Sequence, residues 1–370
     1  MAKSKKKTLP KDFGELCAKA DLETLKEVFE TCDLDARGGY TKKTALAFLE
    51  CPDELARWLV ERGADISARD SYEETPLHTR AHFKQGRLEI LLELGADVHL
   101  RDKNGNTPLH KAAAGYQAPN VKMLLKNGAR ADAENNEHQT PLSYALSRCR
   151  NSDITALSQV ADLLLAASPV PQMKGFLSKL FGSAQVAVSA VTQDIKESVV
   201  RIGTEFEFHR DGFNPDYLDA TSDALERLYR MFDVPPVPRR ARYDGKSPIV
   251  VVGASWEERH QQLWELLVPS RGVSSTVQGE VVRISGRIHD EFERNGGSNW
   301  DADFKNMAEA FLEYTDSGVP LSNDERAEAR GLVADVKLRR GNTARLCELA
   351  VNWVARNPKP LKLPSPNYRR

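Results

Sequence analysis

The sequence predicts a mostly α-helical protein, in which a solenoid of short repeats is followed by a compact α-helical domain. Two phrases, Thr-Pro-Leu and Gly-Ala, recur in step in the first half of the chain, 32 or 33 residues apart. The first phrase begins at Thr75, Thr107 and Thr140, and the second at Gly63, Gly95 and Gly128. A shared period of this length is typical of repeat proteins. In the second half, apolar residues recur at the spacing of one helix face.

The composition limits the classes of protein to consider. Hydrophobic residues make up 41% of the 370 residues and charged residues 28%, a profile typical of folded globular domains. The formal net charge is −1, so the overall charge gives no reason to expect a nucleic-acid partner. No apolar run approaches the roughly 18 residues of a transmembrane helix. The basic start of the chain lacks the apolar core of a secretory signal, and we expect a cytoplasmic protein.

The cysteines predict no cross-links. They are scattered and form no C-x-x-C pair: Cys17, Cys32, Cys51, Cys149 and Cys347. This pattern indicates neither a disulfide framework nor a zinc site, and the thiols are expected to be reduced. No complete catalytic motif is present either. We therefore assign no catalytic residue, metal or cofactor from the sequence.

Each repeat has the punctuation of a pair of helices. Threonine before proline suits a helix start, because threonine can cap the helix and proline tolerates its first turn. Apolar residues at helical spacing follow, and glycine then suits a left-handed helix end. These features resemble the ankyrin family over residues 11–168. The resemblance implies four to five stacked repeats, with a weaker copy at Thr44 and a divergent capping segment over 15–35. Arg80 departs from the pattern, because the family packs a small alanine at that position.

The resemblance also implies where a partner binds. Ankyrin repeats bind through their hairpin tips and through the inner face of each first helix. Carried over by position, these are Ser71, Tyr72, Glu74, His82 and Phe83 in one repeat; Lys103, Asn104, Asn106 and Ala114 in the next; and Asn136, Glu137, Gln139, Ser147 and Arg148 in the last. Tyr72, His82 and Phe83 together suit a binding hot spot. The alternative is that Phe83 fills a gap in this irregular repeat.

The histidines of the repeats invite a second interpretation. His78 and His82 are four residues apart and could face one way on a helix, as metal ligands do. A histidine after Thr-Pro-Leu normally makes hydrogen bonds within the stack, and no third ligand is evident in the sequence. We therefore expect structural roles for His78 and His110.

The segment over 169–234 is predicted to be a helical connector. Residues 173–181 have an amphipathic pattern, which favours docking on the protein, with peripheral membrane contact as the less favoured alternative. A further helix is expected over 217–232. Residues 235–248, which include Arg239, Arg240 and Arg242, are expected to be an exposed Pro/Arg-rich linker.

The compact α-helical C-terminal domain is expected over 249–357, with a β-branched strand at its start. A stretch over 277–294 carries an apolar stripe beside a polar one formed by Glu280, Arg283, Arg287 and Glu291. Such alternating charges favour a solvated helix surface. The alternative is a polar cleft that binds an anion or performs acid–base chemistry. The flanking segments, 1–10 and 358–370, are expected to be a disordered basic start and an exposed Pro-rich tail.

These observations favour a binding role over catalysis. The main hypothesis is an adaptor whose repeats hold a protein partner. One alternative is an enzyme that uses the polar stripe of the C-terminal domain, with the repeats delivering substrate. Another is an immunity-type protein that neutralises a toxin.

Overall fold

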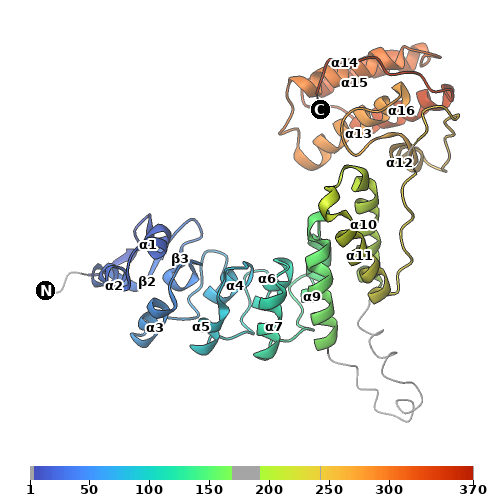
Figure 1. Ribbon diagram of the computed structural model, residues 1–370. Helices are drawn as coiled ribbons and strands as arrows, with labels where there is room; N and C mark the ends of the chain where they lie inside the picture. Colours follow the sequence, from blue (N-terminus) through green and yellow to red (C-terminus); the bar gives the residue numbers. More distant parts are fainter. Residues whose placement is uncertain (1–3, 169–191, 242, 370) are drawn as a thin grey trace, which may run out of the picture. The chain divides into compact units, whose positions relative to one another are not determined.

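The computed structural model describes residues 4–168, 192–241 and 243–369 (Figure 1). It confirms a mostly helical protein with a repeat solenoid followed by a compact helical domain. The chain divides into two compact units, which are considered separately here. The first comprises residues 1–206 and 214–237, and the second comprises 207–213 and 238–370. The predicted segment over 173–181 lies outside the described residues.

The first unit begins with a small sheet, which was not expected from the sequence, and a pair of helices. Its elements are β1 (Lys6–Thr8), α1 (Phe13–Lys19), α2 (Leu22–Thr31), β2 (Cys32–Gly38) and β3 (Lys43–Thr44). The strands lie in the order β1-β2-β3, with β1 parallel to β2 and Lys6 opposite Cys32. Phe13 and Phe29 pack edge-on beneath them. The helix pair agrees with the capping segment. The predicted disorder over 1–10 is wrong from residue 4 onward, because backbone pairing holds β1.

Each following repeat contributes two helices, which lie side by side in chain order (Figure 1). The pairs are the 3₁₀ helix Ala45–Ala47 with α3 (Asp53–Glu61), α4 (Pro76–Ala81) with α5 (Leu88–Glu93), α6 (Pro108–Ala114) with α7 (Ala118–Lys126), and α8 (Pro141–Arg148) with α9 (Ile154–Ala167). Threonine caps and first-turn prolines begin α4, α6 and α8, as predicted. Gly63, Gly95 and Gly128 have φ of +94°, +89° and +88°, which confirms the left-handed ends of the second helices.

The repeat around Arg80 is irregular because this arginine is completely buried. Its Nε donates to the carbonyl of Leu46 at 2.8 Å, in the preceding repeat. Both α4 and α5 have only six residues, and the turn between them folds back on Arg80. A side chain at Gly86 would lie 1.9 Å from the Arg80 carbonyl, so the turn requires glycine. The solvent-exposed loop over 82–85 is the result.

The solenoid is capped by α11 (Pro215–Phe232) and by the part of α10 (Gln193–His209) that belongs to the first unit. Arg201 on α10 donates to the carbonyl of Leu146 at 2.8 Å, at the C-terminal end of α8, where carbonyls lack helical partners. Arg227 on α11 forms an ion pair with Asp162 on α9. Part of the predicted connector is therefore packed against the last repeat.

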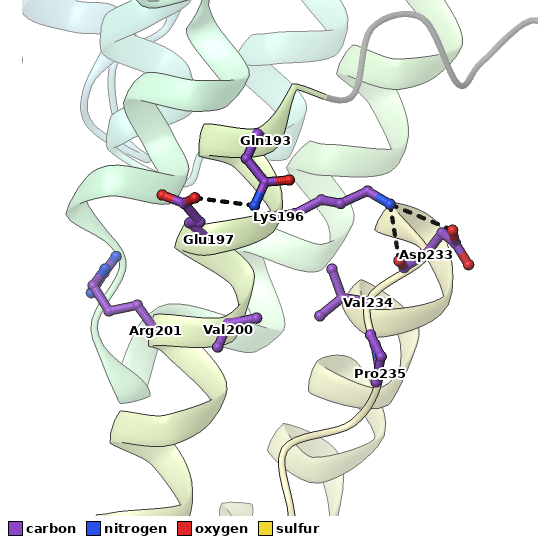
Figure 2. A pocket seen from close by; sticks show the side chains of 8 residues that line it. All are labelled: Gln193, Lys196, Glu197, Val200, Arg201, Asp233, Val234 and Pro235. Atoms are coloured by element: carbon purple, nitrogen blue, oxygen red, sulfur yellow. Dashed lines mark hydrogen bonds and ion pairs between the residues drawn. The ribbon is translucent and has the colours of Figure 1, made fainter. Parts of the chain in front are cut away.

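An open groove of about 450 Å³ lies on this cap, between the start of α10 and the chain that leaves α11 (Figure 2). Lys196 spans one side, because its ammonium donates to the carbonyl and the carboxylate of Asp233. The groove is lined by Gln193, Lys196, Glu197, Val200, Arg201, Asp233, Val234 and Pro235. None of the predicted partner-binding residues lines it.

In the described part of the second unit, five α-helices that lie wholly within it surround one apolar core. They are α12 (Trp256–Leu267), α13 (Val277–Asn295), α14 (Ala302–Thr315), α15 (Asn323–Lys337) and α16 (Thr343–Arg356). The central helix α13 packs against α12, α14 and α16. The expected strand over 249–252 is wrong. The backbone of Val250 and Val252 bonds instead to the side chain of Gln262, so no ladder forms.

Two segments expected to be exposed are partly anchored. In the predicted linker, Pro235, Pro236 and Arg239 are exposed. Arg240 is half-buried and donates to the Trp264 carbonyl at the end of α12. In the predicted tail, Tyr368 is only 5% exposed. The predictions of full exposure are therefore wrong at these positions, because each side chain finds buried partners within the second unit.

Candidate partner-binding surface

In each of three hairpin tips, one short polar side chain holds the turn. The side chains of Asp70, Asp102 and Asn135 each accept from two backbone N–H groups of their own turn. Short polar side chains are favoured in such turns for this reason. Backbone bonds then join successive tips, as from the N–H of Lys103 to the carbonyl of Tyr72 at 3.2 Å. The tips consequently form one continuous edge.

Arginines tie the same edge together from below. The guanidinium of Arg69 donates to the carbonyl of Glu73 in its own tip at 3.1 Å and to that of Arg101 in the next repeat at 2.7 Å. Arg37 and Arg101 each donate in the same way to one carbonyl of their own tip and to one carbonyl of the next repeat. Because each arginine bridges two repeats, the spacing of neighbouring tips is held by hydrogen bonds as well as by the core.

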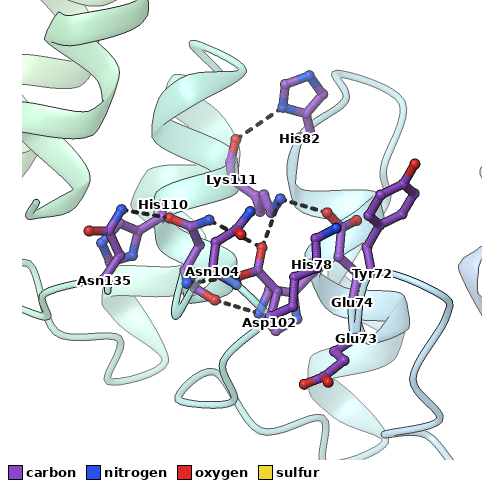
Figure 3. Close-up of polar contacts among 12 residues, drawn as sticks. Tyr72, Glu73, Glu74, His78, His82, Asp102, Asn104, His110, Lys111 and Asn135 are labelled. Carbon is purple, nitrogen blue, oxygen red and sulfur yellow. Dashed lines mark hydrogen bonds and ion pairs between the residues drawn. The ribbon is translucent and has the colours of Figure 1, made fainter. Parts of the chain in front are cut away.

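Histidines link the inside of one repeat to the next (Figure 3). His110 Nδ1 accepts from the N–H of Thr107 at 3.1 Å, and its Nε2 donates to the carbonyl of Gln139 at 3.0 Å. His78 bonds in the same way to Thr75 and to the carbonyl of Asn106. Both rings are fully buried. Both nitrogens of each ring are occupied, so these histidines have the expected structural role.

Burial lowers the pKa of His78 and of His110 to about 4, because a charged imidazole is poorly solvated there. A proton on Nδ1 would also face the threonine N–H donor. The fold therefore favours the neutral rings. Their contribution to stability is complete above the unfolded pKa of about 6.5 and is lost as the pH falls toward 4.

We expect the free energy of unfolding of the repeats to fall by roughly 5 kcal/mol between pH 7 and pH 4.5 on account of these two histidines. Urea unfolding followed by circular dichroism at a series of pH values measures the slope. Carboxylates also titrate in this range. The informative comparison is therefore between the pH dependence of the unmodified chain and that of His110→Ala, which should lose about half of the histidine contribution. An unchanged slope in this variant would contradict the assignment.

A buried ion cluster lies behind the tips, also shown in Figure 3. The Lys111 ammonium lies 2.9 Å from Asp102 and 2.6 Å from Glu74. Burial alone would lower the pKa of Lys111, but hydrogen bonds with the two carboxylates raise it. The same ammonium lowers the pKa of Asp102 despite burial of that carboxyl. Glu74 therefore holds a fixed place at the inner edge of the tip.

The structure separates the sequence-predicted site residues into three groups. Exposed residues are Ser71, Tyr72, His82, Phe83, Lys103, Asn104, Asn136, Glu137, Ser147 and Arg148. Glu74 and Gln139 are half-buried, as is Ala114. Asn106 is only 1% exposed, because its amide donates to Asp102 and its oxygen accepts from Asn135. Its assignment to the binding surface is a wrong prediction, since a partner cannot reach it in this conformation.

The aromatic residues of the irregular repeat stand out from the others. Tyr72 is 37% exposed and Phe83 is 43% exposed, which is high for large apolar side chains. His82 packs edge-on against Phe83, with 4.9 Å between ring centroids, and contacts the carbonyl of Lys111. Lys103 lies over the Tyr72 ring at 4.3 Å. Phe83 is therefore displayed at the surface and does not fill an internal gap.

One exposed aromatic was missed by the sequence analysis. Tyr40 is 93% exposed at the turn between β2 and β3, which is the tip of the first hairpin. Its neighbour Thr41 accepts a backbone bond from Ser71, just as Tyr72 accepts one from Lys103. The repeat period could have located this residue, because Tyr40 stands one repeat before Tyr72, in the degenerate first copy.

Residues 80–167 match the family model of ankyrin repeats in three copies. This region is an ankyrin-repeat domain. No curated protein matches the chain. Ankyrin repeats are generally modules of protein–protein interaction, so the chain carries a protein-binding domain. The match begins at Arg80, and the two earlier copies, Thr-Ala-Leu at Thr44 and Thr-Pro-Leu at Thr75, extend the same architecture toward β1.

The polar stripe on α13 is largely buried and does not form the expected solvated surface. Glu280, Arg283 and Glu291 are 0%, 2% and 5% exposed, and Arg287 is half-buried. Glu280 accepts from Arg283, whereas Glu291 accepts from Asn299 in the glycine-rich turn after the helix. The two carboxylates therefore organise different loops. The expectation of a solvated surface is wrong for this stripe, and the polar cleft stays a prediction.

Within 4–168, 192–241 and 243–369, no group of three or more His, Cys, Asp or Glu side chains could hold a metal ion. Among the helices in these ranges, none is long and apolar enough to cross a membrane.

Proposed function

We propose that the protein is an adaptor whose ankyrin repeats bind a protein partner through the hairpin tips and the adjoining inner face. The observation that carries the proposal is that Tyr72, His82 and Phe83 of one repeat are all exposed, while hydrogen bonds join the tips of neighbouring repeats. Aromatic side chains dominate binding hot spots because they bury a large area at a small cost in conformational entropy. The repeat-to-repeat hydrogen bonds hold the backbone of the tips in place before binding.

The electrostatics of this face suit a partner with mixed charge. Lys103 and Arg148 are exposed cations, while Glu74 and Glu137 offer carboxylates along the same edge. Such rim charges contribute mainly to orientation and to the rate of association. We place the interaction in the cytoplasm, which agrees with five buried, unpaired cysteines.

A triple variant, Tyr72→Ala with His82→Ala and Phe83→Ala, should lose its specific partner in a pull-down from host lysate. We expect at least a 30-fold weaker affinity, since removing one hot-spot residue costs about 2 kcal/mol or more. The affinity for the captured protein is then measured by calorimetry with both purified components.

The matched control is Tyr217→Ala, an aromatic that is 63% exposed on α11 of the same unit. It should bind the partner as the unmodified chain does. Circular dichroism must show that the triple variant keeps its helical content. Full retention of the partner by the folded triple variant would refute this surface as the binding site.

A further inference from the structure

Residues 358–369, named the strap here, lie in the second unit as an extended chain along the start of α13. The N–H of Val277 donates to the carbonyl of Leu361 at 2.9 Å, and Thr276 forms an antiparallel bridge with Lys362. The N–H of Ile249 donates to the carbonyl of Pro358 at 2.7 Å. The strap is therefore held by backbone bonds of the kind that join strands.

One amide side chain recognises the backbone at the start of the strap. Gln278 is 0% exposed, and its Nε2 donates to the carbonyls of Asn357 and Lys359 at 2.9 and 2.8 Å. Its Oε1 accepts from the N–H of Leu361 at 3.0 Å. These three bonds require an extended backbone but do not depend on the strap's side chains.

A side-chain pocket receives the other end of the strap. The Tyr368 ring is 5% exposed, and its hydroxyl donates to Glu280 Oε1 at 2.6 Å. Glu280 is held by the N–H of Ser274 at 2.9 Å and by two nitrogens of Arg283. Burial and the nearby carboxylate raise the pKa of Tyr368, so its hydroxyl remains a donor. The pocket is thus complementary to a tyrosine in both shape and hydrogen bonding.

These contacts have the character of a bound peptide. In peptide recognition by strand addition, backbone bonds supply affinity and a pocket for one side chain supplies specificity. Four prolines, at 358, 360, 364 and 366, favour an extended strap and lower the entropy lost on docking. Lys359, Lys362 and Ser365 remain exposed between the anchors. Tyr368 belongs to the apolar core of the unit, and Leu361 and Leu363 pack against that core. The strap thus contacts the unit through these anchors, with exposed residues between them.

We propose that the face formed by Ser274, Thr276, Gln278, Glu280 and Arg283 is a peptide-binding groove that the strap occupies and thereby closes. Its partner is an extended segment of another protein that places a tyrosine over Glu280. Such a segment must displace the strap to bind. The affinity in trans is consequently reduced by the fraction of time that the strap is docked. This site is separate from the ankyrin surface and does not depend on it.

The test uses the full-length chain and a fluorescein-labelled synthetic peptide that spans residues 355–369. Tyr368→Ala in the chain removes the anchor of the strap, so this variant should bind the labelled peptide in fluorescence anisotropy. We expect an affinity at least tenfold above that of the unmodified chain. A peptide carrying Tyr368→Phe should bind the variant about tenfold more weakly, since one hydrogen bond to a charged group is lost.

Tyr217→Ala is the control, and it should bind the peptide no better than the unmodified chain. Equal binding by the unmodified chain and Tyr368→Ala, or no binding by either, overturns the proposal. Tyr368→Phe in the chain guards against a folding defect, because it keeps the ring. Loss of helical circular dichroism in both Tyr368 variants would show that the strap is part of the core, which also overturns it. A concentration-dependent dimer of the unmodified chain that disappears in Tyr368→Ala would identify a second copy as the occupant, against a heterologous partner.

Discussion

Glu280→Gln should destabilise the second unit by about 3–5 kcal/mol, the range for breaking a buried ion pair. The substituted side chain has almost the same shape, so the effect is electrostatic. All the groups that contact the Glu280 carboxylate are donors: Ser274 N–H, Arg283 Nε and NH2, and the Tyr368 hydroxyl. An amide presents one NH₂ of its own and cannot accept from all of them. The buried Arg283 also loses the carboxylate charge that two of its nitrogens contact.

Tryptophan fluorescence during urea unfolding measures this effect selectively. Four of the five tryptophans, at 256, 264, 300 and 353, lie in the second unit, while Trp58 is in the first. The matched control is Glu293→Gln, an exposed carboxylate on the same helix, which should change the stability by less than about 0.5 kcal/mol. Equal stability of the two variants would show that the Glu280 cluster contributes little.

His110→Ala should lower the free energy of unfolding of the ankyrin domain by about 3 kcal/mol. The change deletes a fully buried ring, removes the acceptor of the Thr107 N–H and leaves the Gln139 carbonyl without its donor. These losses fall at the interface between two repeats. Because a solenoid is stabilised by contacts between neighbouring repeats, the damage should also reduce the cooperativity of unfolding.

Far-UV circular dichroism in urea gives both the midpoint and the slope for this variant. His99→Ala is the control, because the His99 side chain is exposed and its backbone N–H donates to Asp97. We expect the control to unfold with the unmodified chain. If His110→Ala unfolded with the same midpoint and slope as the control, the hydrogen bonds of His110 to Thr107 and Gln139 would contribute little to stability.

The sequence predicted the repeats because each depends on local rules that recur. Threonine before proline starts a helix, glycine ends one, and a histidine three residues after the threonine completes the cap. These rules act within a few residues, so they are visible in any one copy and are reinforced by repetition. The resemblance to ankyrin repeats placed Tyr72 and Lys103 at the hairpin tips, although it also wrongly placed Asn106 among the exposed residues.

The failures at Glu280, Arg283 and Arg80 share one physical cause, which is burial of polar groups by partners distant in the sequence. Periodicity places Glu280 and Arg283 on one face of a helix but does not show what covers that face. The covering residue is Tyr368, 88 positions away from Glu280. Arg80 is similar, since carbonyls of the preceding repeat satisfy its guanidinium. Short-range patterns cannot encode such contacts.

The sequence by itself therefore determined the class of fold, the repeat boundaries near Thr75, Thr107 and Thr140, and the general protein-binding character of the first half. Only the tertiary structure decided that α10 and α11 cap the solenoid, that Phe83 is displayed, and that the strap packs along the start of α13. Local helix punctuation is a property of neighbouring residues. Exposure and hydrogen-bond satisfaction depend on which distant segments pack together, and that is settled only when the whole chain has folded.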